Sequence, residues 1–254
     1  METIKAVFSY TFREHVRNKV WLGGALFGLV MLAGGLVVSA LAADERGRVM
    51  LDLGLAANEI IALVSVVFLT VHLILQEIES RSVFLILTHP VRRWHYLMGR
   101  FLGTLGAVGA GLAAMGLAHW ALLKLLGWGG DGWYLAAWLC SFGKVAVMGA
   151  LALLLSLALT SEAAAMAFSV FFWILGHFSA ELRFVADKSG NALLRSALLV
   201  FSWAAPDFAH FDYRNAWHAG APDPRWMAAG AVYALAYAGA CFALSVQVFE
   251  QKEF

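Results

Sequence analysis

Apolar residues fill most of the chain in long stretches, and the charged residues gather between them. The uncharged windows approach the ~20 residues that a helix needs to cross the hydrocarbon core of a membrane. These windows lie between Lys19 and Asp44, Glu59 and Glu77, Arg100 and Lys124, Lys144 and Glu162, Glu162 and Glu181, and Arg225 and Glu250. The pattern predicts six transmembrane helices, so the expected fold is all-α and polytopic, with residues 1–254 forming a single transmembrane domain.

The composition agrees with this pattern. Apolar residues make up 61% of the chain, charged residues make up 14%, and the mean hydropathy is +0.74. Soluble domains are about 45–50% apolar and about 25% charged, so a water-soluble fold is excluded. The net charge of +1 gives no reason to expect nucleic acid or another strongly acidic partner.

An even number of spans puts both termini on the same side of the membrane, and the basic residues indicate which side. Lys5, Arg13, Arg17 and Lys19 precede the first span, Arg81, Arg92, Arg93 and Arg100 lie between spans 2 and 3, and Lys252 ends the chain. Most basic residues of the other side fall in one long loop, where the positive-inside bias is weaker. We therefore expect both termini in the cytoplasm.

The segments outside the spans have their own patterns. Residues 2–19 alternate apolar and basic positions at helical spacing, which predicts an interfacial helix against the lipid bilayer. The first span is expected at about 20 to 42, a short outer loop at 44 to 52, the second span at 55 to 76 and the last at 226 to 248. Residues 182–224 are expected to form one or two short outer-side helices. Gly24 with Gly28 and Gly99 with Gly103 have the GxxxG spacing that lets helices approach closely.

The fourth span is harder to place, because Lys144 interrupts it. We expect the aromatic residues Trp128, Trp133, Tyr134 and Trp138 to lie at the membrane interface, before a span from about 140 to 160. Lys144 would then extend to the outer surface from near the helix end. A tight turn at Ser161 and Glu162 should lead into span 5, which is expected to end near Glu181.

The stretch from Gln76 to Gly103 reads QEIESRSVFLILTHPVRRWHYLMGRFLG. A five-residue apolar run, Val83 to Leu87, is too short to cross a bilayer, and Pro90 ends it. This pattern favours a short helix at the cytoplasmic face that docks a soluble partner. An ordinary solvated loop is the alternative that composition leaves open.

From Glu77 to Gly103 the sequence resembles the ABC-2 permease family: an acidic pair, a short helix ending in a Pro-Val-x-Arg turn, and a Gly-Arg opening of the next span. The leading FSYTFREHVRNKVW resembles that family's elbow helix. The segment SWAAPDFAHFDYRNAWH resembles the permeases of nitrous-oxide-reductase assembly, also described as multicopper-enzyme-maturation permeases. The chain departs from the family in having Val83 where Thr is frequent and Arg100 where Lys is frequent.

The resemblance implies a permease homodimer in the bacterial inner membrane, bound to two copies of a cytoplasmic ABC ATPase that holds ATP and Mg, with no cofactor in this chain. It implies a coupling loop at 77–98 and an elbow at 2–19. The expected ATPase-coupling residues are Glu77, Glu79, Arg81, Ser82, Leu85, Thr88, His89, Pro90, Arg92 and Arg93, with Arg13 and Arg17 on the elbow. A periplasmic accessory protein is a further expected partner, facing residues 182–224.

No catalytic motif accompanies these features. The only Gly-Lys pair, Gly143-Lys144, is followed by Val145 rather than the Ser or Thr of a phosphate-binding loop, and neither HExxH nor GxSxG occurs. Asp207, His210, Asp212 and His218 cluster in sequence but match no metal motif, so no metal site is expected. For His72, His119 and His177 we expect neutral, hydrogen-bonded side chains.

The resemblance implies a function in export, or in mechanical signalling across the membrane, driven by a separate ATPase and linked to maturation of a periplasmic metalloenzyme. A haem, lipid or polysaccharide exporter shares the same features. A membrane-embedded enzyme is an alternative of another class, and it requires several of His72, His119, Lys144 and His177 to converge at one depth. A structural scaffold without an ATPase also stays open.

Overall fold

A computed structural model describes residues 2–17, 28–29, 33–37, 40, 46–80, 92–129, 131–213 and 222–252. Within these ranges the regular structure is entirely helical, and no strand occurs. The elements are α1 (Glu2–Arg17), α3 (Arg46–Glu79), α5 (Arg93–Leu125), α6 (Asp131–Ala158), α7 (Glu162–His177), α8 (Ser179–Lys188), α9 (Ala192–Ala204), the 3-10 helix η1 (Phe208–Phe211) and α11 (Pro224–Gln251). The all-α, polytopic prediction is confirmed.

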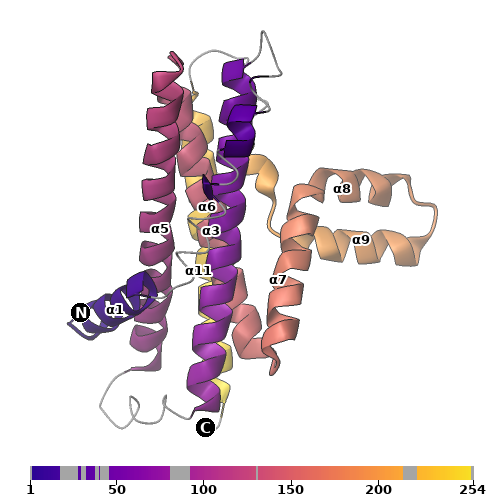
Figure 1. Ribbon diagram of the computed structural model, residues 1–254. Coiled ribbons are helices and arrows are strands. Elements are labelled where there is room, and N and C mark those ends of the chain that lie inside the picture. The colour runs from indigo at the N-terminus through magenta and orange to yellow at the C-terminus, as the bar shows by residue number, and fades with distance from the viewer. Residues whose placement is uncertain are drawn as a thin grey trace.

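Four long helices, α3, α5, α6 and α11, stand side by side as a bundle (Figure 1). Each is long and apolar enough to cross a membrane, and they correspond to the predicted spans 2, 3, 4 and 6. The buried core between them is made of aliphatic side chains such as Val66, Leu97, Val108 and Met148. The predicted first span lies largely outside the described residues.

The N-terminal part of α3 corrects one prediction. The segment from 44 to 52 was expected to be an outer loop, but α3 already begins at Arg46. The additional turns are stabilised because Met50, Leu51 and Leu55 are buried against the bundle. At Gly54 an added Cβ would lie 2.1 Å from the His119 ring, so α5 approaches α3 closely here.

Helix α6 corrects a second prediction, because it is continuous from Asp131 to Ala158. Two of the four aromatic residues expected at the interface pack against α5: Tyr134 donates a hydrogen bond to the Gly116 carbonyl (2.6 Å) and Trp138 donates one to the Leu112 carbonyl (3.2 Å). Lys144 therefore lies midway along the helix. It is buried and does not extend to the surface as expected.

The turn between α6 and α7 is as predicted, since Ser161 is the N-cap residue of α7 and its side chain accepts a hydrogen bond from the Ala164 amide. The end of span 5 differs from the prediction. Helix α7 ends at His177, and α8 leaves it at 70°. Gly176 explains the position of the bend, because a Cβ there would meet the Pro206 carbonyl at 2.5 Å. The absent side chain makes room for the segment before η1.

Helices α8 and α9 pack on each other as a hairpin that projects sideways from the bundle (Figure 1). Short helices were predicted in this region, and they are present. Residues 192–211 are also long and apolar enough to cross a membrane, which the sequence analysis did not anticipate. With the bent α7–α8 pair, the described part of the chain holds five or six candidate spans.

Candidate functional site

Helix α1 lies across the first half of α5, near the end of the bundle where the C-terminus lies (Figure 1). The contact depends on two glycines of α5. A Cβ on Gly99 would lie 2.6 Å from Val7 Cβ, and one on Gly103 would lie 2.6 Å from Thr11 Cβ. The GxxxG pair at 99 and 103 thus forms a groove for α1, which confirms the predicted close approach.

The sequence of α1 orients it in this groove. Thr11 and His15 are buried on the side that faces α5, while Arg13 and Arg17 are exposed on the other. The two elbow arginines named from the resemblance therefore point away from the bundle.

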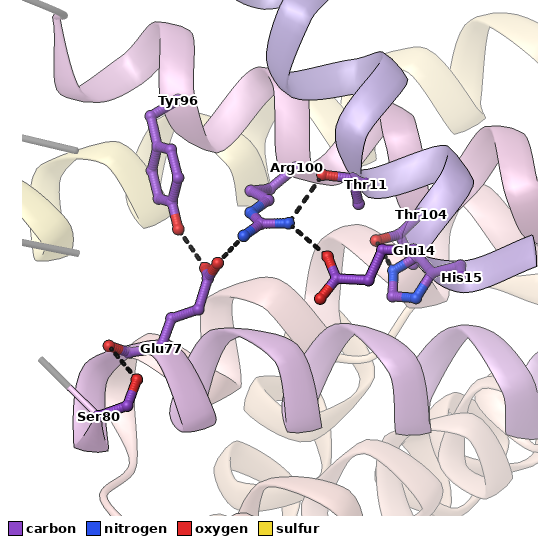
Figure 2. Close-up of polar contacts among 8 residues, drawn as sticks. All are labelled: Thr11, Glu14, His15, Glu77, Ser80, Tyr96, Arg100 and Thr104. Atoms are coloured by element: carbon purple, nitrogen blue, oxygen red, sulfur yellow. Dashed lines mark hydrogen bonds and ion pairs between the residues drawn. The ribbon is translucent and has the colours of Figure 1, made fainter. Parts of the chain in front are cut away.

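Arg100 is the centre of a polar network on this contact. Only 4% of its side chain is exposed. Its Nη1 donates hydrogen bonds to Thr11 Oγ1 (3.0 Å) and to the Glu14 carboxylate (2.9 Å), while Nη2 forms an ion pair with the Glu77 carboxylate. Figure 2 shows how these side chains converge on the guanidinium from α1 and α3.

Glu77 completes the network from the end of α3. Its side chain is 13% exposed, and it accepts a hydrogen bond from the Tyr96 hydroxyl as well as from Arg100 (Figure 2). Charge-assisted contacts of this kind are stronger than neutral ones. Removing one partner of a buried ion pair costs about 3–5 kcal/mol, because the remaining charge is left uncompensated. The network therefore fixes α1, α3 and α5 to one another.

His15 lies beside this network on α1. Its Nε2 is 2.9 Å from the Thr104 hydroxyl of α5. Burial, followed by the positive charge of Arg100, lowers the pKa of His15 from 6.5 to about 4. The imidazole is therefore neutral at physiological pH, as a side chain packed beside a guanidinium should be.

Arg93 links the start of α5 to the end of α11. Its Nη1 donates hydrogen bonds to the carbonyls of Phe249 (3.2 Å) and Glu250 (3.0 Å). A cation there also interacts favourably with the negative end of the helix dipole. The Tyr96 ring stacks on Phe249 with centroids 6.2 Å apart. The last span is thus tied to the same end of α5 as the Arg100 network.

The predicted coupling residues divide into two groups. Arg81, Ser82, Leu85, Thr88, His89 and Pro90 lie outside the described residues. Of the others, Glu79 and Arg92 are exposed, whereas Glu77 and Arg93 make the internal contacts described above. The two residues with internal contacts thus connect helices within the chain.

The sequence analysis missed the α1 half of this network, Thr11 and Glu14, as well as Tyr96. One signal was present. Arg100 stands between Gly99 and Phe101, one turn or more inside α5 and next to apolar residues, and such a cation needs a carboxylate close by. Glu14, an acidic residue on a mostly basic helix, was the candidate.

A second polar site lies farther along the bundle. Lys144 donates a hydrogen bond to the Glu59 carboxylate at 2.8 Å, and both side chains are 9% exposed. Ser141 donates to the same carboxylate, and His177 Nε2 is 4.0 Å from it. Of the four residues that an embedded enzyme would bring together, Lys144 and His177 meet here.

The other two histidines have separate partners. His72 contacts the Glu162 carboxylate at 3.0 Å, and His119 contacts the Tyr134 hydroxyl and the Met50 carbonyl, both at 3.2 Å. The convergence required by an embedded enzyme is therefore only partial. In the segment that contains Asp207 and His218, the Asp207 carboxylate accepts hydrogen bonds from Ser179 and Arg183, and His218 lies outside the described residues. Where residues are described, no three His, Cys, Asp or Glu side chains are grouped as a metal site.

The comparison with protein families gives a match. A family model described as ABC-2 family transporter protein matches residues 56–254, which is most of the chain. The match begins within α3 and includes the rest of that helix, α5 and the segment between them. No curated protein matches the chain at a significant level.

Proposed function

This chain belongs to the ABC-2 family of transporter proteins, and we propose that its Arg100 network transmits movement from a separate ATPase to the membrane-spanning helices. Family membership makes the chain a membrane-spanning permease subunit of an ABC transporter. The network is the observation that carries the proposal, because it joins α1, α3 and α5 through one buried guanidinium.

The position of the network supports this role. Glu77 lies two residues before the end of α3, and Arg93 is the first residue of α5, so both lie within residues 77–98, the segment that the family resemblance assigns to coupling. A movement of that segment would be transmitted to α1 through the contacts of Arg100 and to α11 through those of Arg93. Because buried ion pairs resist separation, these helices would move together rather than one at a time.

The outward-facing charges supply the contact with the partner in this proposal. Glu79 is exposed at the end of α3 and Arg92 is exposed just before α5, both within the coupling segment, and Arg13 and Arg17 are exposed on α1. ATP and Mg would be bound by the ATPase, since this chain has no phosphate-binding loop.

The assembly proposed on this basis is a homodimer of permeases with two ATPase subunits, in a bacterial cytoplasmic membrane with both termini in the cytoplasm. The resemblance to permeases of nitrous-oxide-reductase assembly favours work that supports maturation of a metalloenzyme outside the cytoplasm. That narrower function stays a prediction, because the matching family is the wider one.

Co-purification tests the partner contact. The tagged chain is expressed in its host membrane, extracted in detergent and purified, and the co-purifying proteins are searched for an ABC ATPase. We expect the wild type to retain the ATPase and the Glu79→Ala/Arg92→Ala variant to lose it, because both exposed charges are removed.

The matched control is Asp187→Ala/Arg195→Ala, which removes one acidic and one basic exposed residue from the α8–α9 hairpin. It should retain the ATPase. If no ATPase accompanies the wild type, the proposed function fails; if both double variants lose it equally, the contact is not at the coupling segment.

A further inference from the structure

The two legs of the α8–α9 hairpin are joined at their base by Asp207, which follows α9. The Asp207 carboxylate accepts hydrogen bonds from the Ser179 hydroxyl (2.7 Å) and the Arg183 guanidinium (3.0 Å), both on α8. It also accepts one from the Ala209 amide of η1 (3.1 Å). Charge-assisted hydrogen bonds of this kind are strong. The base of one leg is therefore fixed to the base of the other, and the hairpin is expected to move as one body.

Two tyrosines of α11 hold the same base from the side of the bundle. The Tyr233 hydroxyl accepts a hydrogen bond from the Asp207 amide (2.6 Å). The Tyr237 hydroxyl donates one to the carbonyl of Ala204, the last residue of α9 (2.7 Å). Because the tyrosines are four positions apart, they lie on one face of α11, and their ring centroids are 6.0 Å apart. Both hydroxyl groups thus bind the backbone where the hairpin returns to the bundle.

Close packing of η1 on α11 accompanies these hydrogen bonds. A Cβ on Gly230 would lie 3.0 Å from the His210 carbonyl, so the two backbones approach closely. The His210 ring stacks on the Tyr233 ring with centroids 4.4 Å apart, and the Phe211 ring meets it edge-on at 6.0 Å. Ring contacts of this kind depend on the ring rather than on the hydroxyl group. Removing the hydroxyl alone should therefore leave the packing in place.

The other end of α11 contacts the coupling segment. Arg93 donates its hydrogen bonds there, to the Phe249 and Glu250 carbonyls. Helix α11 is continuous between Tyr237 and Phe249, a length of about 18 Å at 1.5 Å per residue. A continuous helix of this length can carry a displacement from one end to the other.

We propose that Tyr233 and Tyr237 are positioning residues that make the α8–α9 hairpin follow α11 when the coupling segment moves. This inference rests on the proposed function, because it extends the path from the coupling end of the bundle, through α11, to the hairpin (Figure 1). Without the two hydroxyl groups the hairpin keeps its own internal bonds at Asp207, but the bonds that tie it to the movement of α11 are gone.

Distances between spin labels on the two copies in the assembled transporter test this inference. A label at Leu193→Cys reports on the hairpin, and one at Leu235→Cys reports on α11. Both side chains are exposed, whereas the native cysteines, Cys140 and Cys241, are buried. Each distance is measured without nucleotide and with ATP and vanadate. In the otherwise unchanged chain we expect both distances to shift.

The test variant is Tyr233→Phe/Tyr237→Phe, which removes both hydroxyl groups and keeps the rings. It should retain the ATPase and the shift at Leu235, and lose the shift at Leu193. A full shift at Leu193 in this variant overturns the inference. Loss of both shifts also contradicts it, because α11 itself would then depend on the hydroxyl groups.

Tyr134→Phe is the matched control, because it removes a hydroxyl group that binds a backbone carbonyl inside the bundle, away from the hairpin. Both label distances should shift as they do in the unchanged chain. If the control loses the shift at Leu193 as the double variant does, the effect is not specific to the α11 tyrosines and the assignment is wrong.

The unchanged chain separates failure of this inference from failure of the coupling proposal. If neither Leu193 nor Leu235 shifts with nucleotide, the coupling proposal fails and this inference fails with it. If Leu235 shifts and Leu193 does not, movement reaches α11 but not the hairpin, and only this inference is overturned.

Hydrogen exchange reports on the contact itself. In Tyr233→Phe/Tyr237→Phe the Asp207 amide loses its acceptor, so exchange in the segment from Ala204 to Phe211 should be faster than in the unchanged chain. Unchanged exchange in this segment would show that the tyrosines do not hold the base of the hairpin.

Discussion

At the scale of single residues, the shape of the Arg100 guanidinium lets one side chain bind groups on two helices at once. The guanidinium presents its donors in a planar fork, so one side chain reaches Thr11 and Glu14 through one nitrogen and Glu77 through the other. The ring of Tyr10 also lies 5.1 Å from the guanidinium carbon. A buried charge that is satisfied from two helices at once stabilises their relative position rather than either helix alone.

His15 gives this contact a dependence on pH. The pKa of His15 is about 4 in the folded chain and 6.5 when the side chain is exposed. Between pH 4 and pH 6.5 the imidazole therefore takes up a proton only in chains in which His15 has become exposed by unfolding. The contribution of His15 to the free energy of unfolding has its full value above pH 6.5 and falls as the pH drops toward 4. At pH 5 the loss should amount to about 2 kcal/mol.

The measurement is the melting temperature of the purified chain in detergent at pH 7.5 and pH 5.0. His15→Gln keeps a side-chain amide for Thr104 but cannot be protonated, so it should lose less stability than the wild type over this range. An identical loss in both proteins would show that His15 does not carry the effect.

The sequence identified some of these residues and misplaced others for physical reasons. Glu77 was found because it belongs to a recognisable local pattern. Glu14 was missed because its partner is 86 positions away, and no local pattern reports such a pair. Lys144 was placed near the surface because an isolated lysine in a span normally extends outward, whereas Glu59 on another helix neutralises it.

At the scale of elements, the α1–α5 contact shows what the periodicity of the sequence can predict and what it cannot. The helical spacing of residues 2–19 predicted α1, and the GxxxG spacing predicted a close approach at Gly99 and Gly103. Which helix fills that groove could not be predicted, since the spacing names no partner. The groove receives α1 of the same chain.

Enlarging Gly103 should release α1. In Gly103→Ala the new Cβ would lie 2.6 Å from Thr11 Cβ and 3.0 Å from the Phe8 carbonyl, so α1 must shift. We expect a loss of about 1–3 kcal/mol in the contact. Trypsin should then cleave α1 faster at its exposed basic residues, Lys5, Arg13 and Arg17.

Gly239→Ala in the middle of α11 is the control, because an added Cβ there meets nothing within 4 Å. The better helix propensity of alanine should make that variant neutral or slightly stabilising. Equal cleavage of α1 in wild type and Gly103→Ala would contradict the close contact.

At the scale of the whole molecule, the bundle was predictable and the α8–α9 hairpin was only partly so. Long apolar windows identify spans because lipid requires every backbone group to be satisfied within a helix. The 70° bend after His177 left no such trace, because the uncharged window continues past it as far as Ala180. It results from the packing of η1 against Gly176, a tertiary contact.

Distance measurement between spin labels in the assembled transporter tests the central claim most directly. A label at Arg195→Cys on the exposed hairpin can be selective, because the two native cysteines, Cys140 and Cys241, are buried. The distance between the two copies is compared without nucleotide and with ATP and vanadate. In the wild type we predict that it changes.

The comparison is Glu77→Gln/Arg100→Gln, which removes both charges and so leaves neither one buried and unpaired. This variant should still bind the ATPase and hydrolyse ATP, but the label distance should respond much less. A full wild-type response in the variant would contradict transmission through the Arg100 network.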